Sequence, residues 1–147
     1  MFKNILIPTD GSKLSQKAIK SGLAFAKSIN ARVTACYVVE PFEPYYYGGY
    51  SPADMPTAKE FEQGARETGK TYLQLIEKAA RAAGLTYSGS VVKADAPHLG
   101  IISAAKKGGC DLIYMASHGR RGLTGVLLGS ETHKVLTHSK IPVLVYR

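Results

Sequence analysis

Several features that would place this chain in a familiar class are missing from its sequence. No apolar run approaches the roughly 20 residues that a membrane-spanning helix needs. The apolar run after Met1 is too short for a signal peptide, and no small-residue cleavage site follows it. The two cysteines, Cys36 and Cys110, stand in no paired motif and lie in or beside apolar runs, which predicts reduced packing residues. The sequence therefore predicts a cytoplasmic protein that does not enter a membrane.

Nucleotide and metal motifs of fixed spacing are also missing. The chain has no Gly-x4-Gly-Lys-Ser/Thr loop and no Gly-x-Gly-x-x-Gly fingerprint. His133 and His138 are five positions apart, which places them on different faces of a helix, and with isolated His98 they predict no zinc site. Magnesium would instead arrive with a bound triphosphate, without a dedicated protein cage.

The charge balance is basic. The chain has 19 Lys and Arg residues against 11 Asp and Glu residues, a formal net charge of +8, which suits a polyanionic partner such as nucleic acid. However, the lysines are spread along the chain. The first predicted helix carries Lys13, Lys17, Lys20 and Lys27 near one face, which is typical of a solvated surface. Nucleic acid is therefore not the predicted partner.

Apolar segments with strand and helix periodicity alternate along the chain. Strands are expected at 2–8, 31–39, 85–93, 111–116 and 142–146, and helices from the N-cap Ser12 to about 29, at 57–83, at 97–107 and at 130–138. This alternation implies right-handed crossovers and a parallel sheet with helices on both faces. The 147 residues predict one α/β domain whose five strands have the order 3-2-1-4-5.

Several local details follow from residue chemistry. Asp95 is expected to cap the helix at 97–107, and Gly84 stands where a C-terminal glycine cap ends the long helix. Gly89 suggests a bulge in the third strand. The long helix is expected to bury one face, made by Phe61, Ala65, Thr68, Tyr72, Leu75, Ile76, Ala79 and Ala83.

The stretch 40–56 is the one irregular region of the predicted fold. It contains four prolines, and four tyrosines lie between Tyr45 and Tyr50. Its length exceeds the usual connection of about 4–6 residues, which suggests a lid or a binding loop. In that case the tyrosines would stack on a base or contact a partner. The alternative is a loop that covers the domain's own edge.

The segment 115–130 carries the strongest functional signal. It leaves a buried strand, contains the glycines Gly119, Gly122 and Gly125 and two adjacent arginines, and ends in the helix-start signal Gly129-Ser130. Glycine lets the main chain approach oxyanions closely, and N–H groups at a helix start favour negative charge. Arg120 and Arg121 would add bidentate contacts to phosphate oxygens. The composition predicts a backbone cradle for an anion such as phosphate.

The predicted topology places this segment where ligands bind in open α/β sheets. Ligands in such sheets lie beyond the carboxyl ends of the strands, at the point where the strand order reverses. The reversal falls between the first and fourth strands. Asp10 follows the first of these strands and the glycine-containing segment follows the other. The fold and the motif therefore predict the same site.

Two stretches of the chain resemble the universal stress protein family. One is Ile5-Leu6-Ile7-Pro8-Thr9-Asp10-Gly11-Ser12. The other is Ser117-His118-Gly119, nine residues, Gly129-Ser130, a helix, and Ile141-Pro142-Val143-Leu144-Val145. The resemblance covers the whole chain. It implies a Rossmann-like sheet of the adenine nucleotide alpha hydrolase type and a regulatory role in the stress response.

The nucleotide-binding branch of this family carries the pattern Gly, two residues, Gly, nine residues, and Gly with Ser or Thr. The second and third glycines are Gly119 and Gly129 here, whereas the first falls on Ala116. Another common glycine of the family falls on Ala94. Each alanine adds one methyl group, which would crowd a ligand without closing the pocket. The resemblance therefore still implies that the chain binds ATP or a related adenine nucleotide.

The resemblance also implies a role for individual residues. Asp10 would hold the ribose or the adenine, the backbone of Val38 would meet the adenine edge, and Ser130 would join the two glycines at the phosphates. The full set of expected contacts is Pro8, Thr9, Asp10, Val38, Met115, Ala116, Ser117, His118, Gly119, Arg120, Arg121, Gly129, Ser130 and Glu131.

Other functions remain open at this point. Ala116 and Ala94 favour a dimeric interaction protein of the same family that does not bind nucleotides. A slow ATPase is a third possibility. Hydrolysis is expected to be slow because no general base faces a γ-phosphate, and Asp10, the only nearby carboxylate, is expected to recognise the sugar or base. The run at 115–119 lacks the first glycine of a hydrolase nucleophile elbow, and its helix begins too late, so an esterase is not predicted.

The last strand is apolar and is expected at a sheet edge, which usually needs a partner. The family resemblance implies a homodimer paired through this strand, Pro142 to Tyr146. An inward-facing charge, as in Val143→Glu, is expected to weaken such a dimer.

Overall fold

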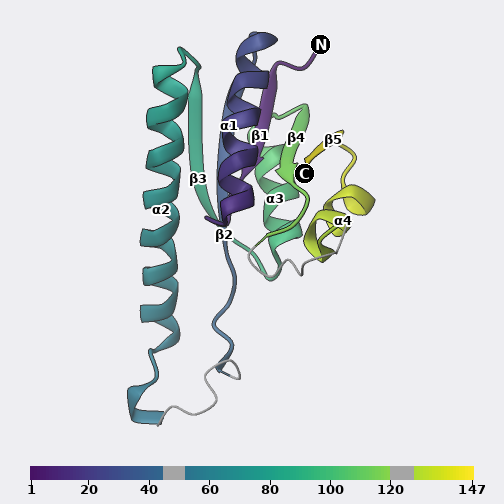
Figure 1. Ribbon diagram of the computed structural model, residues 1–147. Coiled ribbons are helices and arrows are strands. Elements are labelled where there is room, and N and C mark those ends of the chain that lie inside the picture. The colour runs from purple at the N-terminus through teal and green to yellow at the C-terminus, as the bar shows by residue number, and fades with distance from the viewer. Residues whose placement is uncertain (45–51, 120–127) are drawn as a thin grey trace.

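The computed structural model describes residues 1–44, 52–119 and 128–147. Its elements are β1 (Asn4–Pro8), α1 (Lys13–Ser28), β2 (Arg32–Val39), the 3-10 turn η2 (Pro52–Asp54), α2 (Ala58–Ala82), β3 (Tyr87–Lys93), α3 (Pro97–Lys107), β4 (Leu112–Ala116), α4 (Ser130–His138) and β5 (Val143–Tyr146). The strands form a five-stranded sheet of order β3-β2-β1-β4-β5 in which all neighbours run parallel (Figure 1). The predicted fold class and strand order are confirmed.

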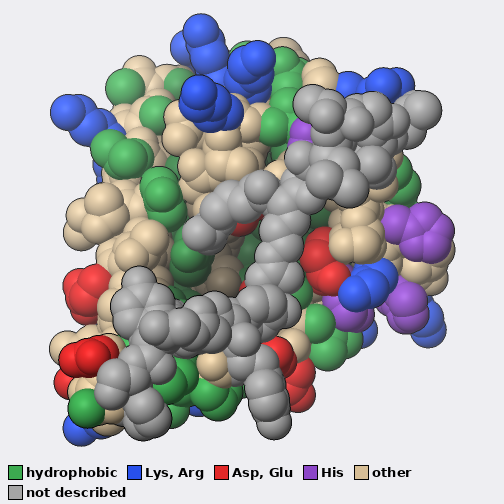
Figure 2. Space-filling view, turned by 60° about the horizontal axis from the view of Figure 1, so that its bottom comes forward, with side chains coloured by type: hydrophobic (Ala, Val, Ile, Leu, Met, Phe, Trp, Pro, Cys, Tyr) green, Lys and Arg blue, Asp and Glu red, His purple; other side chains and the backbone are tan. Residues whose placement is uncertain are grey.

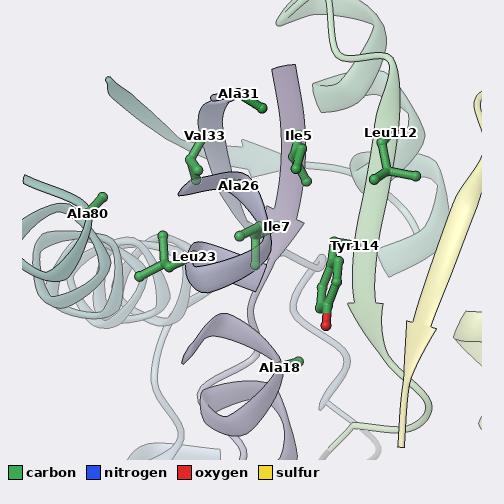
Figure 3. Close-up of a cluster of buried hydrophobic side chains, with 10 residues drawn as sticks. All are labelled: Ile5, Ile7, Ala18, Leu23, Ala26, Ala31, Val33, Ala80, Leu112 and Tyr114. Atoms are coloured by element: carbon green, nitrogen blue, oxygen red, sulfur yellow. The ribbon is translucent and has the colours of Figure 1, made fainter. Parts of the chain in front are cut away.

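The core lies on both faces of the sheet because side chains alternate along each strand. The first cluster joins β1, β2 and β4 to α1 and α2 and consists of Ile5, Ile7, Ala18, Leu23, Ala26, Ala31, Val33, Ala80, Leu112 and Tyr114 (Figure 3). The second cluster joins the opposite face to α3 and α4 and includes Leu6, Ile113 and Val135. Helices α1 and α2 therefore cover one face, and α3 and α4 cover the other.

The buried face of α2 agrees with the predicted one only in part. Its buried residues are Gly69, Leu73, Ile76 and Ala80, whereas the side chain of Leu75 is 62% exposed. At Gly69 the helix lies close to the sheet, since a Cβ atom there would lie 2.5 Å from the ring of Tyr37 on β2. Ile76 was predicted correctly, and Ala65 and Tyr72 pack against a buried cluster as expected. The assignment of Leu75 was wrong, because a pattern of apolar residues ignores a glycine that lets a helix contact the sheet.

Two further local expectations are wrong. The N-cap of α3 is Ala96, with no hydrogen bond from a side chain, so Asp95 does not cap this helix. Strand β3 pairs with β2 without interruption from Tyr87 to Lys93, so Gly89 forms no bulge. Instead, a Cβ atom at Gly89 would lie 2.5 Å from the hydroxyl of Tyr87. Two other signals are confirmed: Ser12 caps α1, and Gly84 ends α2 with a φ of 76°.

Helix α2 extends past the carboxyl ends of the strands (Figure 1). The ring of Phe61 near its start lies 5.2 Å from the ring of Phe42, which follows β2. The tyrosine stretch 45–50 lies outside the described residues, so its predicted roles stay predictions. Among the residues that are described, no helix combines the length and apolarity needed to cross a membrane.

Candidate functional site

The loop after β1 holds the side chain of Asp10 in a fixed orientation. The backbone N–H of Ser12 donates to Oδ1 of Asp10 over 2.9 Å. Before it, the N–H of Thr9 donates to the carbonyl oxygen of Cys36 on β2 over 2.9 Å. The Thr9 hydroxyl oxygen accepts from the hydroxyl of Ser15 at 2.9 Å, which joins the loop to α1. The Asp10 carboxylate is thus presented at the carboxyl end of β1.

Gly119, in the loop after β4, lies directly against this carboxylate. A Cβ atom at Gly119 would overlap Oδ2 of Asp10. Only glycine permits this approach, because any other residue would displace the Asp10 side chain. The loops after β1 and β4 therefore meet where the strand order reverses, which is the predicted location of the site.

The backbone of Val38 faces the same region. In a strand, residues two positions apart present their backbone groups to the same side. The carbonyl of Cys36 faces β1, since it accepts from Thr9, so the backbone groups of Val38 also point toward the β1 side, where β1 has already ended at Pro8. The Val38 side chain packs on Gly100 of α3, where a Cβ atom would lie 2.6 Å from its Cγ2.

Helix α4 begins in direct contact with the end of β4. Its N-cap is Gly129, whose N–H donates to the carbonyl of Ser117 over 2.7 Å. The Thr132 hydroxyl donates to the carbonyl of Ala116 over 3.0 Å. A Cβ atom at Gly129 would lie 3.0 Å from the Cα of His118, so this position also requires a small residue. Ser130 is the first residue of the helix rather than its N-cap, and it is exposed.

Ser117 has a structural role at this junction. It is 2% exposed, its N–H donates to the carbonyl of Tyr146 over 2.7 Å, and its carbonyl accepts from Gly129. Its hydroxyl lies 3.2 Å from Nδ1 of His118. The expected contact of Ser117 with a nucleotide stays a prediction. Met115 is also buried, with its side chain in the second cluster, so it can contribute to a site only through its backbone.

Glu131 contacts α3. Its Oε2 accepts from the backbone N–H of His98 at 2.8 Å and from Nδ1 of the same residue at 2.9 Å, while Oε1 accepts from Nζ of Lys134 at 2.7 Å. Burial alone would raise the pKa of Glu131, but the hydrogen bonds from Lys134 and His98 lower this pKa below its usual value. The group is therefore anionic at neutral pH. Its expected contact with a nucleotide stays a prediction.

Two residues near the site make contacts that the sequence did not indicate. His98 is not isolated, because its ring binds Glu131 and lies 5.7 Å from the ring of His138. Tyr72 of α2 lies over the loop after β1, where Gly11 has a φ of 78° and a Cβ atom would overlap the Tyr72 ring. The helical period placed Tyr72 on a buried face, but no sequence signal pairs it with Gly11.

The structure thus brings Asp10, the Val38 backbone, Gly119 and the first turn of α4 to one end of the molecule. Figure 2 views this end and shows a hollow near its middle, with Lys and Arg side chains gathered along the upper part of the view. Arg120 and Arg121 lie outside the described residues, so their predicted phosphate contacts stay predictions. In the part of the chain that is described, no cluster of three or more His, Cys, Asp or Glu residues is arranged to hold a metal ion.

The fold and the geometry define a doubly wound α/β protein with a glycine-lined candidate site at its topological switch point. The model of the universal stress protein family matches residues 1–147. A universal stress protein of Methanocaldococcus jannaschii is 32% identical over 150 residues, which cover 100% of this chain and 83% of the relative. The chain belongs to the universal stress protein family.

Solved structures agree with this assignment. The universal stress protein UspA from Lactobacillus plantarum matches with a TM-score of 0.83 and 25% identity, over 99% of this chain and 97% of that one. A universal stress protein solved in complex with cAMP matches with a TM-score of 0.71 and 24% identity, over 99% and 97% of the two chains. At that identity, the second likeness shows the shared fold.

Proposed function

We propose that residues 1–147 form one universal stress protein domain that binds ATP or a related adenine nucleotide and acts as a cytoplasmic regulator in the stress response. The observation that carries the proposal is the contact between Gly119 and Asp10. This contact places a carboxylate beside a loop whose backbone can approach phosphates. The carboxylate can accept hydrogen bonds from the hydroxyl groups of a ribose or from the amino group of a base. The family relative in complex with cAMP supports an adenine nucleotide as the ligand class.

Each part of the nucleotide has residues that suit it. The Val38 backbone offers both an N–H and a carbonyl toward the end of β1, and an adenine edge pairs with such a donor and acceptor. The N–H groups of the first turn of α4, together with its helix dipole, suit phosphates. Magnesium would enter with the triphosphate, whose oxygens supply most of its ligands.

Ala116 and Ala94 do not oppose this proposal. Ala116 is half-buried and its side chain packs against the first hydrophobic cluster, so the protein's own core accommodates the methyl group. The N–H of Ala94 donates to the carbonyl of Val39 over 3.1 Å, which continues the pairing of β3 with β2. Hydrolysis of the nucleotide is expected to be slow, because positioning without a general base leaves most of the catalytic power unrealised.

Calorimetric titration of nucleotide-free protein with Mg-ATP tests the proposal. We expect saturable binding at one site, and weaker binding of Mg-GTP, because guanine reverses the donor and acceptor pattern that adenine offers to the Val38 backbone. The absence of any heat of binding with Mg-ATP would contradict the proposal. It would favour the alternative, a dimeric interaction protein of this family without nucleotide binding.

We also propose a homodimer that pairs through β5. Among the described residues, this strand pairs with β4 alone and lies at the end of the sheet. The carbonyls of Pro142 and Tyr146 accept from β4, at 2.9 and 2.7 Å, so the even-numbered residues face β4. The backbone groups of Val143 and Val145 therefore face the open edge. An apolar strand with free backbone groups is a template for pairing with a second copy.

The substitution Val145→Pro is expected to abolish this dimer and leave the fold intact. Proline removes the outward N–H of Val145 but none of the bonds to β4, a position where strands tolerate proline. Light scattering should report the monomer mass for Val145→Pro and the dimer mass for the control Val145→Ala. Val143→Glu is less specific, because the Val143 side chain packs against the second cluster and a charge there would also disturb the fold. A dimer mass for Val145→Pro would contradict pairing through this edge.

A further inference from the structure

Glu131 joins the two helices that begin at the candidate site. It is the second residue of α4, and its carboxylate accepts two hydrogen bonds from His98, the second residue of α3, at 2.8 and 2.9 Å. The side chains of His98 and Glu131 are 13% and 30% exposed, so the pair is largely shielded from water. Such shielding strengthens charge-assisted hydrogen bonds.

Helix α3 has no cap within its own sequence. Its N-cap, Ala96, has no side chain that accepts a hydrogen bond, and Pro97, the first helical residue, has no N–H. The first N–H group that needs an acceptor is that of His98, and the Glu131 carboxylate is this acceptor. The capping role that the sequence assigned to Asp95 is therefore performed by a residue of another helix.

The same contact fixes the first turn of α4. This turn is held at three places: the Gly129 N–H bonds to Ser117, the Glu131 carboxylate bonds to α3, and the Thr132 hydroxyl bonds to Ala116. Two of these bonds attach the turn to the end of β4. Among the residues that the structure describes, the hydrogen bonds of Glu131 with His98 are the ones that attach this turn to a neighbouring helix, and they limit rotation of α4 about the end of β4.

The charge of Glu131 is compensated locally. Lys134 Nζ lies 2.7 Å from its Oε1, and the ring of His98 donates to Oε2. An uncompensated carboxylate in the first turn of α4 would repel a phosphate bound at that helix end. Because Lys134 compensates the charge of Glu131 and the carboxylate bonds to α3, the N–H groups of α4 remain available to an anion.

We propose that Glu131 is a positioning residue: by binding the first turn of α3, it holds Gly129 and Ser130 of α4 in the orientation that receives nucleotide phosphates. The proposal rests on the proposed nucleotide function and assigns Glu131 a role without contact to the ligand. Preorganised groups bind more tightly because the ligand does not have to order them.

Titration of two variants with Mg-ATP tests this role. Glu131→Ala is expected to weaken binding about tenfold, which corresponds to about 1.4 kcal/mol, the size of a lost helix cap. Glu131→Gln keeps an amide oxygen that accepts from His98, so its affinity is expected to stay within about threefold of the unmodified protein. Glu77→Ala, which removes an ion pair with Arg81 on α2, is the matched control. Equal losses in both Glu131 variants would overturn the proposal and indicate direct contact of the carboxylate with the ligand.

Amide hydrogen exchange in the nucleotide-free protein supplies a readout that does not depend on binding. In Glu131→Ala, the amides of His98 and Gly129 should both exchange faster than in Glu131→Gln, because the first turns of α3 and α4 lose their connection. Faster exchange at His98 alone would show that Glu131 only caps α3, and would overturn the proposal. If the unmodified protein failed to bind Mg-ATP, the proposed function would fail, while exchange at Gly129 would still decide whether Glu131 holds α4.

Discussion

The substitution Gly119→Val is expected to weaken Mg-ATP binding by about 100-fold or more while leaving the fold intact. A Cβ atom at this position would overlap the Asp10 carboxylate, so the substitution displaces the residue proposed to hold the ribose or base. It also prevents the close backbone approach proposed for the phosphates. A displacement of site groups by about 1 Å produces losses of about this size. Calorimetric titration and circular dichroism would measure affinity and folding separately.

The matched control for this prediction is Gly64→Val. Gly64 is on an exposed side of α2, and apart from its chain neighbours and the nearby backbone of the helix itself, no atom lies within 4 Å of a Cβ atom at this position. Valine is slightly better than glycine within a helix, by a few tenths of a kcal/mol. The control should bind Mg-ATP as the unmodified protein does. Unchanged affinity in Gly119→Val would show that the junction of the loops after β1 and β4 is not the binding site.

The largest effect on stability is expected from Leu6→Ala. Leu6 lies on β1 in the middle of the sheet, is 0% exposed, and belongs to the second cluster between the sheet, α3 and α4. Removing such a side chain leaves a cavity and costs about 2–5 kcal/mol. For a chain of this size, about 3 kcal/mol corresponds to a fall in melting temperature of about 10 °C. Urea titration and thermal denaturation would measure the change.

The same substitution at Leu75 is the control. Leu75 is 62% exposed on α2, and sequence periodicity alone had assigned it to the buried face. Because the side chain is mostly in water and alanine is the better helix former, Leu75→Ala is expected to change stability by less than about 0.5 kcal/mol. A loss at Leu75 as large as that at Leu6 would mean that α2 packs through the face predicted from its apolar residues.

Most of the architecture was predictable because the signals are local and repeated. Continuous apolar runs such as Ile5-Leu6-Ile7 indicate strands covered on both faces, and their alternation with amphipathic segments limits the topology to a few arrangements. The location of the site followed from the same reasoning, since Asp10 and Gly119 come directly after strands that must be neighbours. These inferences require no knowledge of which side chains meet.

The contacts between distant segments were not predictable in this way. The buried face of α2 depends on Gly69 meeting the ring of Tyr37, and a glycine contributes nothing to a hydrophobic pattern. Similarly, Asp95 has the chemistry and position of a cap, yet the carboxylate that bonds to the start of α3 comes from Glu131, 33 residues along the chain from His98. Capping rules consider neighbours in sequence, whereas the backbone N–H donates to whichever acceptor the fold brings near.

The sequence by itself determined the strand order, the family, and the end of the sheet where a ligand is proposed to bind. These depend on periodicity and on short motifs, which local chemistry sets. Only the tertiary structure decided that Gly119 lies against Asp10, that Ser117 is buried, and that Glu131 connects α4 to α3. Contacts of this kind depend on the close approach of segments far apart in the chain, and those distances are set only when the whole core is packed.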